Sequence, residues 1–170
     1  MRFFDFFHSN AQSLNFSGQI GLPVLSGIFL IVCQSLVFLF PFAFIALIPL
    51  LYAMAKYPYR HPFLPGFITG IVAYLGLIYW VIVAMNTYGG IDIFTSTLIL
   101  LLFVLYLSLY LGCFTTAVFI LEKKMSVPVY LSVPIVWTLL EYLRGVALTG
   151  FPWSFLGHSQ HNFLIFIQIA

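Results

Sequence analysis

Long stretches without a charged side chain dominate this chain of 170 residues. No Asp, Glu, Lys or Arg occurs between Asp5 and Lys56, between Arg60 and Asp92, between Asp92 and Glu122, or between Lys124 and Glu141. Charged residues make up 6% of the chain and hydrophobic residues 63%, whereas an ordinary soluble domain is about 25% charged. A water-soluble fold cannot cover its surface with so few charges, so the sequence predicts an integral membrane protein.

The uncharged stretches are long enough to hold several membrane-spanning helices, each of which needs about 20 mostly apolar residues. We predict an all-α bundle of about five transmembrane helices within residues 21–148. A cytoplasmic N-terminal segment (1–20) precedes the bundle, and an aromatic loop rich in Gly and Pro (149–162) and the start of a truncated sixth helix (163–170) follow it. The five expected spans cover residues 21–38, 41–55, 62–85, 93–121 and 127–148, and Pro134 is expected to kink the last of them.

Basic residues indicate the orientation, because cytoplasmic loops of membrane proteins are enriched in Lys and Arg. Lys56 and Arg60 lie between the second and third expected spans, and Lys123 and Lys124 lie between the fourth and fifth. These loops and the N-terminus are therefore expected in the cytoplasm. The loops 86–92 and 149–161 should then face outward.

Two charges depart from this pattern near the outer end of the last expected span, namely Glu141 and Arg144. Charges at membrane depth are costly and usually mark a functional site. At a spacing of i, i+3 the two side chains share a helix face and can pair. The sequence leaves three interpretations open: a purely structural ion pair, an arginine that snorkels to the interface, or a guanidinium that binds a lipid phosphate.

Small residues at helical spacing predict close packing between helices. Gly66 and Gly70 form a GxxxG motif on the third expected span, and Ser108, Gly112 and Thr116 form a stripe on the fourth. We interpret both as ordinary bundle packing rather than as a dimerisation signal. Tyr106 and Tyr110, beside the second stripe, are interpreted as packed side chains.

The sequence indicates neither a metal site nor a cofactor. Cys33 and Cys113 lie in expected spans, far apart in the chain, and no Cys/His cluster has metal-ligand spacing. No glycine-rich phosphate-binding loop is present. A net charge of +2 is too small to indicate binding to nucleic acid.

The segment 139–160, LLEYLRGVALTGFPWSFLGHSQ, carries three motifs in order. They are Glu-Tyr-Leu-Arg-Gly from Glu141, Thr-Gly-Phe-Pro-Trp from Thr149, and Gly-His-Ser-Gln from Gly157. The segment resembles the end of the N-terminal membrane domain of the bacterial apolipoprotein N-acyltransferase family. Weaker similarities are Tyr79-Trp80 followed by Tyr88-Gly89-Gly90, and the run Tyr106-Leu-Ser-Leu-Tyr110. The chain departs from the family at His158, where Tyr is more frequent, and at Val146, where an aromatic residue is frequent.

The resemblance implies a transferase of the bacterial inner membrane. This family moves a fatty acyl chain from a phospholipid to the N-terminal diacylglyceryl-cysteine of a lipoprotein, through a thioester formed on an outer nitrilase-like domain with a Glu-Lys-Cys triad. No triad residue can be matched here, because the cysteines lie in expected spans and Lys56, Lys123 and Lys124 lie in expected cytoplasmic loops. We therefore assign no catalytic residue, and expect a chain that holds only the membrane domain and is inactive alone.

The resemblance also implies which residues meet the substrates. The candidate substrate-binding residues are Trp153, Arg144, Glu141, Pro152, Gly150 and Tyr88. We expect Trp153, held by Gly150 and Pro152, to line a portal for acyl chains, and Arg144, steadied by Glu141, to lie near a phospholipid headgroup.

Several alternatives stay open at this point. Trp153 could be an interfacial anchor, and Tyr88-Gly89-Gly90 could be a plain tight turn. The whole chain could be a non-catalytic membrane subunit, such as a small transporter component or a scaffold. The sequence does not determine the oligomeric state.

Overall fold

The computed structural model describes residues 16–35, 41–43, 45–57, 59 and 61–160, and these residues form helices and turns without a strand. The helices are α2 (Phe16–Ser35), α3 (Ile48–Lys56), α4 (Phe63–Ile78), α5 (Trp80–Thr87), α6 (Ile93–Met125) and α7 (Val129–Val146), followed by the 3-10 turns η2 (Ala147–Thr149) and η3 (Leu156–Gln160). Helix α2 begins at Phe16, whereas the first span was expected to begin at residue 21. The expected sixth helix (163–170) lies outside the described residues.

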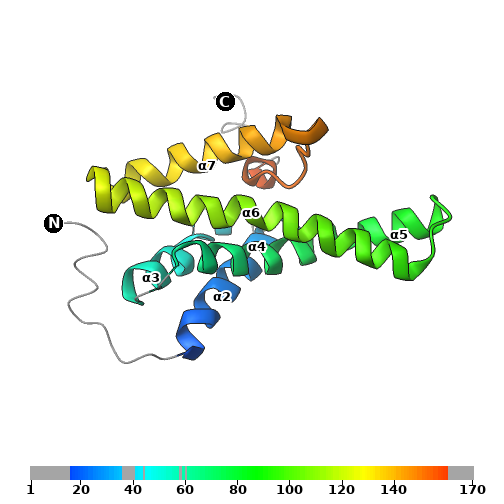
Figure 1. Ribbon diagram of the computed structural model, residues 1–170, viewed down its shortest axis with the longest axis horizontal. Helices are drawn as coiled ribbons and strands as arrows, with labels where there is room; N and C mark the ends of the chain where they lie inside the picture. The colour runs from blue at the N-terminus through cyan, green and yellow to red at the C-terminus, as the bar shows by residue number, and fades with distance from the viewer. Residues whose placement is uncertain (1–15, 36–40, 44, 58, 60, 161–170) are drawn as a thin grey trace.

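Helix α6 forms the long axis of the molecule (Figure 1). Helix α4 packs along one flank of α6, and α7 runs antiparallel to α6 along another (Figure 1). Helix α2 crosses α4, α3 packs against both of them, and α5 lies beside α6. The 3-10 turn η3 contacts α2, which brings the segment after α7 back onto the body of the bundle.

Two of the described helices are long and apolar enough to cross a membrane, Ser17–Ser35 and Ile93–Met125. A third crossing results if α4 and α5, which meet at a bend of 46°, form one broken span. The expected all-helical membrane class is thus supported, but the count of five spans is not confirmed. Pro134 lies inside α7, and the helix continues across it from Val129 to Val146.

The close contact between α4 and α6 requires glycine, which has no side chain, at two positions of α4. A Cβ atom added to Gly66 would collide with the Leu111 carbonyl oxygen and the Thr115 hydroxyl. A Cβ atom on Gly70 would come within 2.8 Å of Ser108 Cα. All three partner residues belong to α6, so the GxxxG motif serves packing within the bundle, as the sequence indicated.

A buried proline in α2 is compensated by a tyrosine from another part of the chain. Pro23 has no N–H, so the carbonyl of Gln19 loses its normal helical donor. The hydroxyl of Tyr59, in the connection between α3 and α4, donates to that carbonyl at 2.6 Å. Burial raises the pKa of Tyr59 above its usual range, so the phenol stays protonated and remains a donor.

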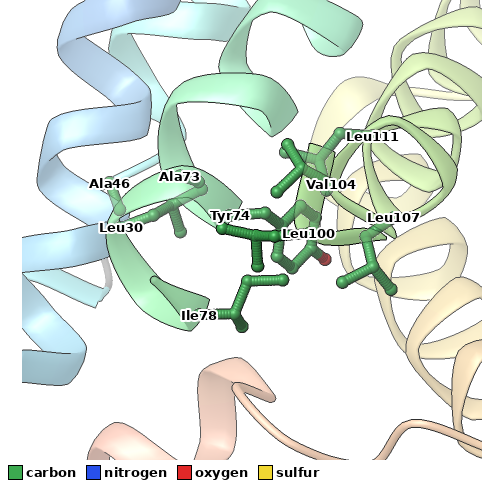
Figure 2. Close-up of a cluster of buried hydrophobic side chains, with 9 residues drawn as sticks. All are labelled: Leu30, Ala46, Ala73, Tyr74, Ile78, Leu100, Val104, Leu107 and Leu111. Atoms are coloured by element: carbon green, nitrogen blue, oxygen red, sulfur yellow. The ribbon is translucent and has the colours of Figure 1, made fainter. Parts of the chain in front are cut away.

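The core of the bundle is an apolar cluster contributed mainly by α4 and α6. Figure 2 shows its nine buried residues, Leu30, Ala46, Ala73, Tyr74, Ile78, Leu100, Val104, Leu107 and Leu111. Tyr74 is the member of this cluster with a polar side-chain atom, and it is 3% exposed. Because a buried hydroxyl requires a partner, the position of its oxygen leads directly to the candidate site.

Candidate functional site

The chain reverses direction directly after α7. Leu148, Gly150 and Ser154 have positive φ values of 51°, 79° and 58°, which the left-handed region allows most readily for glycine. The Gly150 N–H donates to the Ala147 carbonyl at 2.8 Å. A Cβ atom on Gly150 would collide with the Gly145 carbonyl oxygen. We call residues 147–155 the return loop, because this backbone folds them toward α7.

Glu141 and Arg144, one turn apart on α7, hold the return loop in place. The ion pair predicted from their spacing is present, with Arg144 Nη2 at 3.9 Å from Glu141 Oε1. Glu141 Oε1 also accepts from the Leu156 N–H at 2.7 Å. Arg144 Nη2 donates to the Ser154 carbonyl at 3.2 Å. Two side chains of one helix turn therefore bind the backbone at the far end of the loop and at Leu156, the residue that follows it.

The Arg144 guanidinium connects the loop to the core. It is 4% exposed, and its Nη1 donates to the hydroxyl of Tyr74 on α4. It also lies over the ring of Phe155, with Cζ at 4.8 Å from the ring centroid, where a cation is attracted by the aromatic face. The side chain thus points into the protein, and the snorkelling expected as one alternative is not observed.

A small pocket lies beside this pair, between α4, α6 and α7. It is lined by Tyr74, Tyr110, Leu111, Phe114, Trp137, Leu140, Glu141 and Arg144, and its cavity volume is about 20 Å³. The hydroxyls of Tyr106 and Tyr110 lie 2.7 Å apart on α6. Arg144 Nε and Trp137 Nε1 are buried and have no hydrogen-bond partner in the part of the chain that the structure describes.

Aromatic rings connect the return loop to α5 and α6. The ring of Trp153 contacts Trp80 of α5 at a centroid distance of 5.4 Å, and Phe151 at 5.5 Å. Phe151 in turn contacts Phe103 of α6 edge to face at 4.8 Å. Trp153 nevertheless remains 56% exposed. It therefore forms the exposed end of a series of rings in contact.

The structure brings most of the candidate residues together. Arg144, Glu141, Gly150 and Trp153 all form or hold the return loop, and Pro152 is exposed between Phe151 and Trp153. Tyr88 is separate: it is 87% exposed in the turn after α5, where its N–H donates to the Ala84 carbonyl at 3.1 Å. That geometry corresponds to the plain turn that the sequence left open.

Three residues of the site were not identified from the sequence, namely Tyr74, Tyr110 and Trp137. Trp137 could have been found, because Trp137, Glu141 and Arg144 follow an i, i+4, i+7 pattern and share one face of α7. Tyr110 packs against Tyr106, as the sequence predicted, and it also lines the pocket. Nothing in the sequence of α4 singles out Tyr74 as the partner of an arginine 70 positions away.

The described groups can bind and position a ligand, but they include no assembled nucleophile. Cys33 of α2 and Cys113 of α6 are both free thiols in separate helices. No group of three His, Cys, Asp or Glu side chains comes together among the residues that the structure describes. The site offers exposed aromatic rings, buried hydrogen-bond donors and one carboxylate.

Comparison with known proteins gives one consistent family. Residues 26–170 match the model of the apolipoprotein N-acyltransferase N-terminal domain. The chain is 38% identical over 149 residues to the apolipoprotein N-acyltransferase of Geobacter metallireducens, covering 88% of this chain and 28% of that protein. It is 38% identical over 98 residues to the enzyme of Wigglesworthia glossinidia brevipalpis, covering 57% of this chain and 20% of that protein.

A third relative has the same name. The apolipoprotein N-acyltransferase of Coxiella burnetii is 34% identical over 85 residues, which are 49% of this chain and 18% of that protein. The chain thus spans between 18% and 28% of the length of these three relatives.

Proposed function

Because the chain belongs to the apolipoprotein N-acyltransferase family, we propose that it is the membrane domain of such an enzyme. In this proposal the enzyme transfers a fatty acyl chain from a phospholipid to the N-terminal diacylglyceryl-cysteine of lipoproteins. We propose no catalytic residue within these 170 residues and expect the polypeptide to be inactive alone. N-acylation of a diacylglyceryl peptide by this purified polypeptide would contradict that part of the proposal.

We further propose that the bundle spans the bacterial inner membrane with its N-terminus in the cytoplasm. Lys56 in the last turn of α3, and Lys123 and Lys124 in the last turn of α6, support this orientation. In this arrangement α7 and the segment 41–55, which includes most of α3, also lie in the membrane, and we propose that they complete the five crossings expected from the sequence. Labelling single-cysteine variants in intact cells tests it: Cys at Tyr88 should react with an impermeant maleimide, and Cys at Lys124 should not.

The observation that supports a lipid-handling role best is the exposure of Trp153 on a fixed loop. The indole is 56% exposed although it contacts two other aromatic rings. Its loop is held by Glu141 and Arg144 rather than by apolar packing alone. An apolar surface in a defined position at the end of the bundle suits the approach of an acyl chain, and we propose this role for Trp153, with Gly150 and Pro152 shaping the loop.

The test uses a full-length relative, in which the acyl-enzyme can form. Replacing the tryptophan equivalent to Trp153 with alanine should lower the rate of thioester formation by about tenfold, or about 1.4 kcal/mol in activation free energy. Replacement with phenylalanine should preserve most of the rate, because the ring remains. Wild-type thioester formation in the alanine variant would refute the role.

A matched control separates this role from simple anchoring at the interface. Tyr130, 76% exposed near the other end of α7, is an aromatic side chain that has no part in the return loop. Its replacement with alanine should leave thioester formation unchanged. Equal losses in the Trp153 and Tyr130 variants would indicate membrane anchoring instead of acyl-chain contact.

The expected role of Arg144 and Glu141 remains part of the proposal in a narrower form. Because the guanidinium is buried and bonded to Tyr74 and Ser154, a phospholipid headgroup could reach it only through the adjacent pocket. We therefore propose that the pair supports lipid binding mainly by holding the loop that carries Trp153.

A further inference from the structure

We propose that the pocket between α4, α6 and α7 binds a single water molecule, which accepts hydrogen bonds from Arg144 Nε and Trp137 Nε1. The inference rests on the pocket itself and holds whether or not the proposed acyl-transfer function is correct. It concerns the buried pocket beside Arg144, whereas the proposed function concerns the exposed side chain of Trp153.

The first argument is the pair of unpartnered donors. Both nitrogen atoms are buried, and neither makes a hydrogen bond of good geometry among the described residues, although the Glu141 carboxylate lies close enough to Trp137 to interact with its N–H. Arg144 is 4% exposed and lines the pocket together with Trp137. Native proteins leave very few buried N–H groups unpaired, because such a group gives up its bond to water without replacement. Two unpaired donors on one small pocket therefore indicate an acceptor within it.

The second argument is size. The cavity volume is about 20 Å³, and one water molecule needs roughly 10–15 Å³. One water molecule therefore fits, and the remaining volume is too small for a second. A phosphate group carries four oxygen atoms around phosphorus and is too large for the buried part of this half-open pocket. A single oxygen atom does fit, and the two possible sources are a water molecule or one ester or phosphate oxygen of a phospholipid.

The third argument is charge, and it selects water. Glu141 borders the same pocket as Arg144, so the two charged side chains balance. An anionic phosphate oxygen would be repelled by the Glu141 carboxylate. A water molecule is neutral, and while it accepts from the two N–H groups it can donate to Glu141 and to the hydroxyl of Tyr110. One water can therefore bond to both N–H donors and to both of these acceptors.

The water has a structural consequence for Arg144. Its Nη1 and Nη2 donate to Tyr74 and to the Ser154 carbonyl, and the water occupies Nε. All three nitrogen atoms of the guanidinium are then used within the protein. Arg144 is accordingly a positioning residue for the return loop.

A structure of the intact protein at about 2 Å resolution tests the proposal in two preparations. One is delipidated in lauryl maltoside, and the other is reconstituted in dioleoyl-phosphatidylglycerol nanodiscs. We expect one isolated peak within hydrogen-bond distance of Arg144 Nε and Trp137 Nε1 in both. A peak that appears only in the nanodiscs would assign the oxygen to phospholipid, and an empty pocket in both would eliminate the acceptor; either result overturns the proposal.

A second measurement does not depend on resolution. The ultraviolet resonance Raman difference spectrum between the wild type and Trp137→Phe isolates the indole of Trp137. We expect the signature of a hydrogen-bonded N–H in both preparations. Trp80 provides the matched reference, because its Nε1 donates directly to the Leu77 carbonyl at 3.2 Å. A free indole N–H at Trp137, next to a bonded one at Trp80, would contradict the water.

Discussion

The α4–α6 interface and the junction between α7 and the return loop use opposite means to hold helices together. At the first, Gly66 and Gly70 let two backbones approach so closely that an added methyl group collides with α6. At the second, Glu141 and Arg144 bridge to the loop backbone with hydrogen bonds and an ion pair. The α4–α6 contact requires that Gly66 and Gly70 have no side chain, whereas the junction after α7 requires the polar side chains of Glu141 and Arg144.

Both kinds of contact suit helices that are surrounded by lipid rather than by water. Lipid tails are as apolar as leucine, so burying apolar side chains between helices gains little, and association depends on close packing and on hydrogen bonds. Much of α7 is exposed, including Tyr130 (76%), Ile135 (61%) and Tyr142 (66%). The few polar contacts near its end should therefore contribute a large part of its attachment to α4.

The largest expected effect comes from removing Arg144. Arg144→Ala leaves Tyr74 and the Ser154 carbonyl without their donor and Glu141 without its counter-charge. We expect the free energy of unfolding, measured by SDS titration in mixed micelles, to fall by about 3 kcal/mol, as for other broken buried pairs. The control Lys124→Ala removes an exposed charge at the end of α6 and should change it by less than about 0.5 kcal/mol.

A second variant sharpens this result. Adding Glu141→Gln to Arg144→Ala removes the uncompensated charge but keeps a carbonyl oxygen for the Leu156 N–H. We expect the double variant to recover about 1 kcal/mol relative to the single one. If the double variant is less stable than Arg144→Ala, the junction does not rely on charge pairing.

A single methyl group added at the α4–α6 interface should lower the free energy of unfolding. Gly66→Ala places a methyl group against the Leu111 carbonyl, a backbone atom that cannot rotate away. We expect a loss of about 1–3 kcal/mol in the same titration. Gly21→Ala on α2 is the matched control, because a Cβ atom there meets nothing within 4 Å, and it should be neutral or stabilising by up to about 1 kcal/mol.

The return loop should be sensitive to Gly150 but not to Gly157. Gly150→Ala strains a backbone with φ of 79° and brings Cβ against the Gly145 carbonyl. We expect a loss of about 1 kcal/mol and a change in the fluorescence of Trp153 as the loop shifts. Gly157→Ala, with nothing within 4 Å of its Cβ position, should leave the emission spectrum unchanged.

The smallest expected effect lies outside both regions, at the start of α6. Asp92 caps this helix by accepting from the Thr95 N–H at 2.9 Å, and this interaction holds the pKa of the Asp92 carboxyl below its usual value. A lowered pKa stabilises the folded state above the unfolded pKa, and this stabilisation is lost as the pH falls through the folded pKa.

Thermal melting of the wild type and Asp92→Ala at several pH values measures the stabilisation that the Asp92 cap contributes. The wild type should melt slightly higher above about pH 5, and the difference should shrink toward about pH 2 as the carboxyl becomes protonated. A difference that grows with acidification would reverse the assigned direction of the shift.

The sequence predicted local geometry well and long-range contacts poorly. The spacing of Glu141 and Arg144 indicated that the two side chains can pair, because the period of the helix determines which residues share a face. The GxxxG motif likewise predicted a close helix contact, although only the structure identifies α6 as the partner. The turn after α7 was predictable because Gly150 and Pro152 have restricted or special backbone preferences.

What the sequence could not supply was the identity of partners in other helices. Tyr74 binds Arg144 from 70 positions away, and its neighbours on α4 are as apolar and aromatic as those of many lipid-facing helices. The number of spans was uncertain for a related reason. Length and apolarity identify Ile93–Met125 plainly, whereas α3 is short and α7 carries two charges.

The rise per residue of helix α6 also indicates how deep its residues lie in the membrane. In the proposed orientation Lys123 lies at the inner boundary of the hydrocarbon, and about 20 Å of helix separates it from Tyr110, at about 1.5 Å per residue. The buried arginine site beside Tyr110 is then about two-thirds of the way across a core about 30 Å thick. Phe103, one further step of about 10 Å along the helix, reaches the outer boundary and carries the ring series that ends at Trp153. The remaining turns of α6 extend beyond the lipid tails into the layer where headgroups meet water.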